Sequence, residues 1–144
     1  MMKPISVWKQ ELSGGAHAAR LAALYCCAPE QTPAQAARYE AVLEGLEATF
    51  GPHAEAGLYS APGRTEIGGN HTDHQHGRVL AGSVNIDMIA AAGPNTLGQL
   101  RVQSEGYDLC VIDLNDLAAR KEEENTSAAI LPGECEAFRQ RGAK

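Results

Sequence analysis

A change in the spacing of apolar residues divides this chain into a helical first part and a strand-rich second part. Between residues 32 and 50 the apolar residues recur at steps of three and four, which is the spacing of one face of an α-helix. They are Ala36, Tyr39, Leu43, Leu46 and Phe50. Thr32 and Gln35 fit a capping box, and Gly51 with Pro52 is a typical end of a helix. We predict a helix over residues 33–50, with Thr32 as its N-cap.

From residue 57 onward the spacing of apolar residues changes to two, which is typical of strands. Residues 58–61 predict a short strand that leads into a glycine-rich loop. A longer strand is expected over residues 84–90, and two further strands at 99–103 and 109–112. In the longer strand Val84, Ile86, Met88 and Ala90 alternate with polar residues that include Asn85 and Asp87. We therefore predict that the apolar set forms the buried face.

The order of these elements predicts the fold class. Two short helices are expected from Pro4 to about Leu12 and from Ala16 to Cys26, and a C-terminal helix at residues 125–142, kinked or split by Pro132. Helices, then strands, then a helix indicate an α+β fold with helices packed on a mixed, mainly antiparallel sheet. We expect a single domain over residues 1–144. It consists of a helical lead-in (1–55), strands with a glycine-rich loop (56–113) and the last helix (125–142).

Charge and composition exclude several classes of partner. Twelve Lys and Arg against 18 Asp and Glu leave a net charge of −6, and no basic stripe is present, so neither nucleic acid nor a membrane is expected as a partner. No signal peptide is recognisable, and we expect a cytoplasmic, reduced protein. The adjacent Cys26 and Cys27 are predicted to be buried free thiols. His17 and His53 are expected to face solvent.

Residues 61–77 are denser in functional groups than any other segment of the chain. They include one Arg, two carboxylates, three His, one Asn and four Gly. Glycines allow a ligand to approach the backbone closely, and flanking strands would hold such a loop still. Three interpretations compete: a surface turn whose polar groups satisfy one another, a metal site, and a pocket for a polyol. The metal site would use His71, Asp73, His74 and His76, but no further ligand is evident elsewhere in the chain.

Residues 63–74 read GRTEIGGNHTDH and resemble the galactokinase signature of the GHMP small-molecule kinase superfamily. The usual form of that signature is G-R-x-N-[LIV]-I-G-E-H-x-D-Y. The resemblance is strongest between residues 58 and 93. This chain departs from the pattern at several positions, among them Glu66 in place of Asn, Asn70 in place of Glu and His74 in place of Tyr. Because Asn70 removes a negative charge from the expected pocket, the exact hexose stays open.

The resemblance implies that MgATP phosphorylates galactose, or a close relative, at its anomeric hydroxyl. It implies a catalytic role for Arg64, as a fixed cation near the reacting hydroxyl and the transferred phosphoryl group. It also implies that Asp73 accepts hydrogen bonds from sugar hydroxyls, since a carboxylate accepts two adjacent hydroxyls strongly. The implied substrate-binding residues are Asn70, His71, Asp73 and His74.

The resemblance further implies a second motif, P-x-x-x-G-L-S-S-S-A, which holds the phosphates of ATP at the start of a helix. The 144 residues contain no version of it, and residues 13–15, the nearest candidate, are expected to be a plain helix boundary. We therefore expect an N-terminal portion of a galactokinase that does not bind ATP strongly and is inactive alone. The alternative is a non-catalytic sugar-binding or regulatory module derived from a galactokinase. The sequence predicts no particular oligomeric state.

Overall fold

The computed structural model describes residues 2–69, 76–118 and 127–142, which divide into two compact units, Met1–Pro94 and Asn95–Lys144. The first unit contains β1 (Met2–Pro4), α1 (Ile5–Ser13), α2 (Ala18–Tyr25), a 3₁₀ turn η1 (Pro29–Gln31), α3 (Thr32–Phe50), β2 (Glu55–Gly68) and β3 (Leu80–Ala92). The second contains β4 (Gln99–Val102), β5 (Cys110–Asp113) and α4 (Ser127–Gln140). The predicted α+β class is confirmed. That the whole chain acts as one sugar-binding domain stays a prediction.

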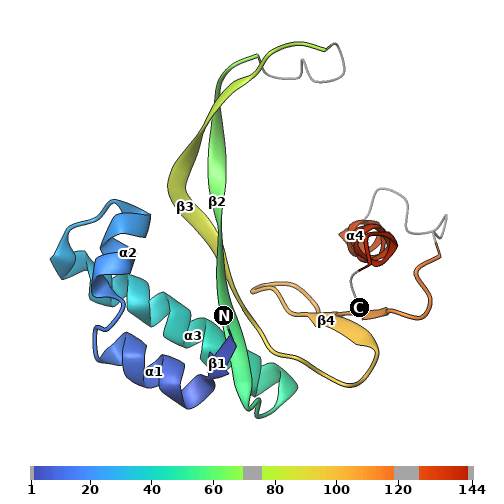
Figure 1. Ribbon diagram of the computed structural model, residues 1–144, viewed down its shortest axis with the longest axis horizontal. Coiled ribbons are helices and arrows are strands. Elements are labelled where there is room, and N and C mark those ends of the chain that lie inside the picture. The colour runs from blue at the N-terminus through green and yellow to red at the C-terminus, as the bar shows by residue number, and fades with distance from the viewer. Residues whose placement is uncertain (1, 70–75, 119–126, 143–144) are drawn as a thin grey trace. The chain divides into compact units, whose positions relative to one another are not determined.

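The strands of the first unit form one antiparallel sheet in the order β1-β2-β3. β1 pairs only with residues 55–57 of β2, whereas β2 and β3 pair from Gly57 and Ala92 to Gly68 and Leu80. Over most of its length the sheet is therefore a two-stranded ribbon. Figure 1 shows α1, α2 and α3 on one side of this ribbon. In the second unit β4 and β5 form a separate antiparallel pair.

Helix α3 ends at the predicted Phe50, begins one residue earlier than predicted and supplies the centre of the core. Its predicted apolar stripe is confirmed, because Ala36, Tyr39, Leu43 and Leu46 are buried and Phe50 packs against them. Leu43 is fully buried, with 0% of its surface exposed. The sheet contributes Ala56, Leu58, Ile89 and Ala91 to the same core. The helices thus cover only the part of the ribbon that contains these residues.

The predicted capping box at the start of α3 is wrong. Thr32 is the first residue of the helix rather than its N-cap, and its buried hydroxyl donates to the carbonyl of Pro29 at 2.7 Å. The side chain of Gln35 accepts a hydrogen bond from Arg38 instead of reaching back to the backbone. The preceding turn η1 already orders the chain in front of the helix, so Thr32 finds its acceptor there.

The predicted buried face of the long strand β3 is also wrong. Ile86 and Met88 are 76% and 78% exposed, while Ile89 and Ala91 pack against the helical core. Alternation reports that a strand has two unlike faces, but it does not report which face the helices cover. Here the helices cover the face that carries Asp87, because that carboxylate finds partners among them, as described below.

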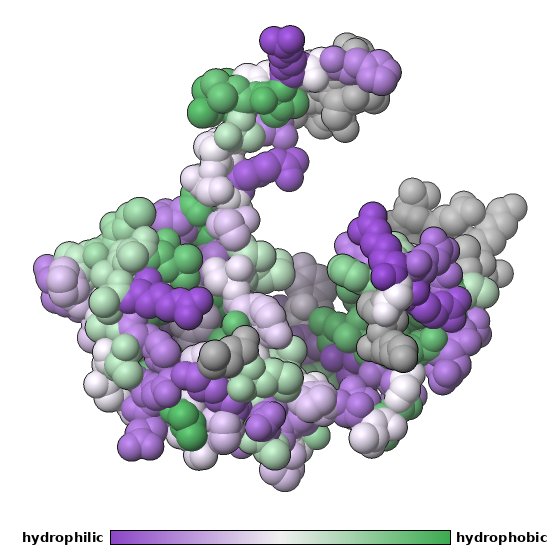
Figure 2. Space-filling view, in the orientation of Figure 1, coloured by the Kyte–Doolittle hydropathy of each residue, from purple (hydrophilic) through white to green (hydrophobic). Residues whose placement is uncertain are grey.

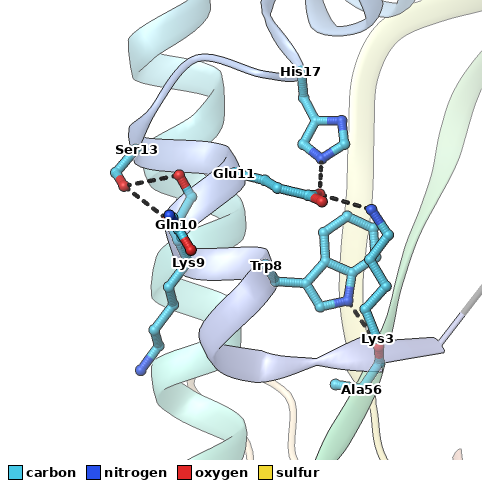
Figure 3. Close-up of polar contacts among 8 residues, drawn as sticks. All are labelled: Lys3, Trp8, Lys9, Gln10, Glu11, Ser13, His17 and Ala56. Carbon is cyan, nitrogen blue, oxygen red and sulfur yellow. Dashed lines mark hydrogen bonds and ion pairs between the residues drawn. The ribbon is translucent and has the colours of Figure 1, made fainter.

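A polar cluster joins β1, α1 and the start of α2 (Figure 3). The Glu11 carboxylate lies 2.7 Å from Lys3 Nζ and 2.8 Å from His17 Nε2, and the Lys3 ammonium lies over the Trp8 ring. Trp8 Nε1 donates to the carbonyl of Ala56 and so ties α1 to β2. The expectation that His17 faces solvent is wrong, because its side chain is only 22% exposed.

Three other expectations differ from the structure. His53 is half-buried, with Nδ1 2.9 Å from the carbonyl oxygen of Gly51, rather than facing solvent. Cys26 is exposed because it is the left-handed C-cap residue of α2, although all four cysteines are free as predicted. Helix α4 continues through Pro132 instead of splitting there. No helix in the described ranges is long and apolar enough to span a bilayer.

Candidate functional site

Residues 63–68 of the segment rich in functional groups lie within strand β2, not in a loop. The prediction of a short strand at residues 58–61 is therefore wrong, since β2 continues to Gly68 and pairs with β3 up to Leu80. Glycines have a weak strand propensity, but the backbone hydrogen bonds between β2 and β3 compensate for it. The strand pair consequently fixes the backbone of this part of the segment.

The pairing of β2 and β3 is irregular where the segment begins. Pro62 pairs with Asp87 and Arg64 with Ser83, so β2 advances two residues while β3 advances four. At Gly63 an added Cβ would meet Val84 Cγ2 at 3.1 Å and the backbone oxygen of Ile86 at 3.2 Å. A side chain there would make these neighbours shift by a few tenths of an ångström, because the extra residues of β3 crowd this point. Such bulges commonly redirect side chains beside functional sites.

A second glycine marks the end of the paired region. Gly69 has a φ of +85°, in the range that residues with a side chain rarely adopt. An added Cβ at this position would lie 2.1 Å from the backbone oxygen of Arg78. The backbone at Gly69 and the backbone at Arg78 thus approach each other closely, and no residue with a Cβ fits at position 69.

Arg64, the predicted catalytic residue, lies on β2 beside this irregularity and is 75% exposed at its side chain. Its guanidinium contacts Glu66 Oε1, with Nη2 at 3.2 Å and Nε at 3.4 Å. Because water competes for so exposed a guanidinium, this ion pair contributes little to stability, although the Glu66 side chain is only 25% exposed. Glu66 therefore serves here as a partner of Arg64, and the guanidinium remains accessible to a ligand.

The other predicted site residues lie outside the described residues. These are the four predicted substrate-binding residues, Asn70, His71, Asp73 and His74. Of the five predicted site residues the structure thus places Arg64, and it does not bring the set together. His76, a fourth member of the proposed metal site, is exposed and has a φ of +56°. Within the described ranges no group of three His, Cys, Asp or Glu residues could hold a metal ion.

The outer end of the β2–β3 ribbon carries apolar side chains beside the polar ones. Ile67, Val79 and Leu80 are exposed there, and Figure 2 shows hydrophobic surface at this end of the ribbon. A hollow in the described part of the chain lies elsewhere, between the end of α3 and the start of β2, and is lined by Phe50, Pro52, His53, Ala54, Glu55 and Pro94. The described part of the segment is therefore displayed on the ribbon and is not enclosed.

One polar cluster was missed by sequence reasoning, and it centres on Asp87 of β3. The Asp87 carboxylate accepts hydrogen bonds from Tyr25 at 2.6 Å, Ser60 at 2.6 Å and Arg38 at 2.7 Å. Tyr39 extends the cluster, with its hydroxyl oxygen 2.8 Å from that of Tyr25. The side chain of Asp87 is only 3% exposed. A charged residue between two apolar ones, Ile86 and Met88, was the available sequence signal.

The surroundings of Asp87 change the ionisation of its neighbours as well as its own. Burial raises the pKa of Asp87, but the hydrogen bonds from Ser60, Tyr25 and Arg38 outweigh it, so its pKa lies below the usual range. Burial and the bond to Asp87 raise the pKa of the Tyr25 hydroxyl. The bond to Asp87 likewise raises the pKa of Arg38. At neutral pH the cluster is therefore an ionised carboxylate with three donors.

Comparison with known proteins identifies the segment. A family model described as the galactokinase galactose-binding signature matches residues 45–94, which include the end of α3 and all of β2 and β3. Over these residues the chain is similar to galactokinases. The resemblance inferred from residues 63–74 is thereby confirmed.

A curated relative supports the same assignment over a longer stretch. The chain is 28% identical over 96 residues to a galactokinase of Lactobacillus helveticus. The matched stretch is 65% of this chain and 24% of that protein, so the chain spans about a quarter of the relative that it matches. No solved structure matches the chain.

Residues 13–15, the sequence's nearest candidate for a loop that holds the phosphates of ATP, lie at the end of helix α1. Here the amides of Gly14, Gly15 and Ala16 donate to carbonyls of α1. Ser13 also donates its hydroxyl to carbonyls of α1. These groups end the helix and offer no free donors to a phosphate, as was predicted for this boundary. We therefore derive no step through ATP or a metal ion.

Proposed function

We propose that this chain binds galactose, or a closely related hexose, through its galactokinase signature. The observation that carries the proposal is the match of the galactose-binding signature to residues 45–94, whose strands present Arg64 at an accessible position. In this proposal Arg64 lies near the anomeric hydroxyl. Asn70, His71, Asp73 and His74 bind the other hydroxyls.

The chemistry of these groups suits a polyol. A guanidinium donates several hydrogen bonds in a fixed fork, and a carboxylate such as Asp73 accepts from two adjacent hydroxyls at once. Asn70 adds a neutral group that both donates and accepts, in place of the Glu of the usual signature. A site of this kind distinguishes epimers, because the wrong sugar leaves buried polar groups unpaired.

We further propose that, in a polypeptide that also supplies an ATP site, the bound galactose is phosphorylated at its anomeric hydroxyl. ATP and Mg²⁺ are the co-substrate and metal of that reaction, and a cytoplasmic location is part of the same proposal. The contribution of this chain is to bind and orient the sugar. Arg64 adds a cation beside the hydroxyl that reacts, where negative charge develops.

Titration calorimetry of the 144-residue chain with galactose tests the sugar-binding proposal. We expect saturable binding of galactose and at least about tenfold weaker binding of glucose, its epimer, since one lost hydrogen-bonding match amounts to roughly 1.4 kcal/mol. Arg64→Ala and Asp73→Asn should each weaken galactose binding by about tenfold or more. Arg20→Ala removes the same charge from an exposed position of α2 and is the matched control. Equal binding by all three variants and the original chain would contradict the site.

A coupled assay for release of ADP separates binding from phosphoryl transfer. With galactose and MgATP we expect no turnover by the 144 residues, while galactose still binds. Sugar binding together with clear turnover would contradict the expectation that these residues lack an ATP site. Sugar binding without turnover, also in a longer polypeptide that contains the ATP motif, would favour the non-catalytic sugar-binding module.

A further inference from the structure

The Asp87 cluster lies where the ribbon changes from packed to exposed. We call residues 55–62 and 87–92 the packed end of the ribbon, and residues 63–68 and 80–86 its signature end. Ala56 and Gly57 of the packed end are buried, whereas no residue of the signature end is. Asp87 pairs directly with Pro62, the last residue of β2 before the register shift. It is therefore the first residue of β3 on the packed side of this boundary.

The cluster joins four elements through one side chain. Asp87 lies on β3 and accepts from Ser60 of β2, Tyr25 of α2 and Arg38 of α3. Hydrogen bonds of 2.6–2.7 Å to an ionised acceptor are of the strong, charge-assisted kind. The Arg38 guanidinium also lies over the Tyr25 ring, 5.5 Å from its centroid. The two helices and the two strands are thus held in one arrangement at this point.

The signature end has no comparable support. Its residues are exposed or half-buried, and the ion pair of Arg64 with Glu66 is weak because the guanidinium is largely exposed. The last point at which the ribbon is fixed to the helices is Asp87, which pairs with Pro62. This point therefore sets the direction of β2 toward Arg64. A two-stranded ribbon alone is a weak scaffold, because isolated hairpins are marginally stable in water.

We propose that Asp87 is a positioning residue for sugar binding, which anchors the β2–β3 ribbon through Tyr25, Arg38 and Ser60 and thereby sets the orientation of Arg64. This inference rests on the proposed function, because it assumes that the signature binds the sugar. Asp87 touches no sugar itself. It acts through the strand that carries Arg64.

The test uses three variants of the 144-residue chain. Asp87→Asn removes the charge but keeps the shape of the side chain. Glu47→Gln makes the same chemical change at an ion pair with Lys9 on the helices, away from the ribbon, and is the matched control. Leu46→Ala lowers stability through the core without altering the cluster, and it measures the effect of lost stability alone.

Two measurements are made on each variant at a temperature where it is folded: galactose affinity by calorimetry, and the backbone amide signals of residues 64–68 by NMR. We expect Asp87→Asn to weaken galactose binding by about tenfold and to shift these amide signals. Glu47→Gln and Leu46→Ala should leave both close to those of the original chain. Original affinity together with unshifted signals in Asp87→Asn would overturn the proposal. An equal loss of affinity in Leu46→Ala would overturn it as well, because the effect would then be one of stability.

The two proposals fail in different ways. If the original chain does not bind galactose, the proposed function fails, and the amide signals of residues 64–68 still decide whether Asp87 anchors the ribbon. If Asp87→Asn does not fold, Ser60→Ala replaces it, because it removes one of the three hydrogen bonds and keeps the other two. We expect a smaller shift of the same signals in Ser60→Ala, and none would overturn the proposal.

Discussion

The two ends of the β2–β3 ribbon share one pair of strands but differ in what supports them. At the packed end the sheet contributes to a helical core and holds a buried carboxylate with three donors. At the signature end the strands are held mainly by their own ladder, and the side chain of Arg64 is largely exposed. The residues that stabilise the fold and the residues of the galactokinase signature thus lie in different parts of the same strands. This separation leaves the signature end accessible while the packed end supplies a rigid base.

The largest effect on stability is expected in the helical core, against which the packed end of the ribbon lies. Leu43→Ala should lower the free energy of unfolding of the first unit by about 2–5 kcal/mol, because it leaves a cavity among fully buried side chains. Trp8 is the only tryptophan, and its indole bonds to the sheet, so its fluorescence during urea unfolding reports this unit. Leu24→Ala, at an exposed position of α2, is the control and should change little. If Leu43→Ala lowers the free energy of unfolding no more than the control does, this account of the core is contradicted.

Neighbouring residues of β3 should differ according to the face that they occupy. Ile89→Ala should cost about 1–3 kcal/mol, since Ile89 packs against the helical core, whereas Met88→Ala should stay within about 0.5 kcal/mol. Urea unfolding of the two variants, followed by Trp8 fluorescence, makes the comparison. A larger loss of stability in Met88→Ala than in Ile89→Ala would mean that the face predicted from alternation is the buried one.

Acid should weaken the packed end through Asp87. The pKa of Asp87 is lower in the folded chain than in the unfolded one, so the unfolded chain binds more protons in acid. The contribution of Asp87 is therefore complete above its ordinary pKa of about 3.9 and is lost as the pH falls through its lower folded value. Unfolding measured from pH 6 down to pH 2 should show this loss.

Asp87→Asn is the variant that isolates this contribution to the pH dependence. We expect a shallower fall of stability with acid than in the original chain. Part of the fall should remain, because hydrogen bonds from Lys3 and His17 lower the pKa of Glu11 as well. A pH dependence identical to that of the original chain would show that another group is responsible.

The smallest effect is expected at the signature end. Glu66→Ala should change the free energy of unfolding by less than about 0.5 kcal/mol, because water competes for the exposed guanidinium of its partner Arg64. Thermal unfolding of this variant beside Leu43→Ala gives the full range between the helical core and the signature end. A loss above about 1 kcal/mol would mean that the signature end contributes to the core after all.

Local sequence patterns determined several features of this protein. The bounds of α3 followed, to within one residue, from the apolar period and from Gly51 and Pro52, and the α+β class followed from the order of the elements. The similarity to galactokinases was recognisable because residues 63–74 form one contiguous motif. Of the candidate site, the structure places Arg64, and the roles of Asn70, His71, Asp73 and His74 stay predictions.

Only the tertiary structure decided which face of β3 is buried and how far β2 extends beyond its predicted end. Both depend on what packs or pairs with a strand, and its own period contains no such information. The Asp87 cluster depends on the same kind of contact, since Tyr25, Arg38, Ser60 and Asp87 are far apart along the chain. A buried charge is stable only where its partners converge, and that convergence exists only in the folded chain.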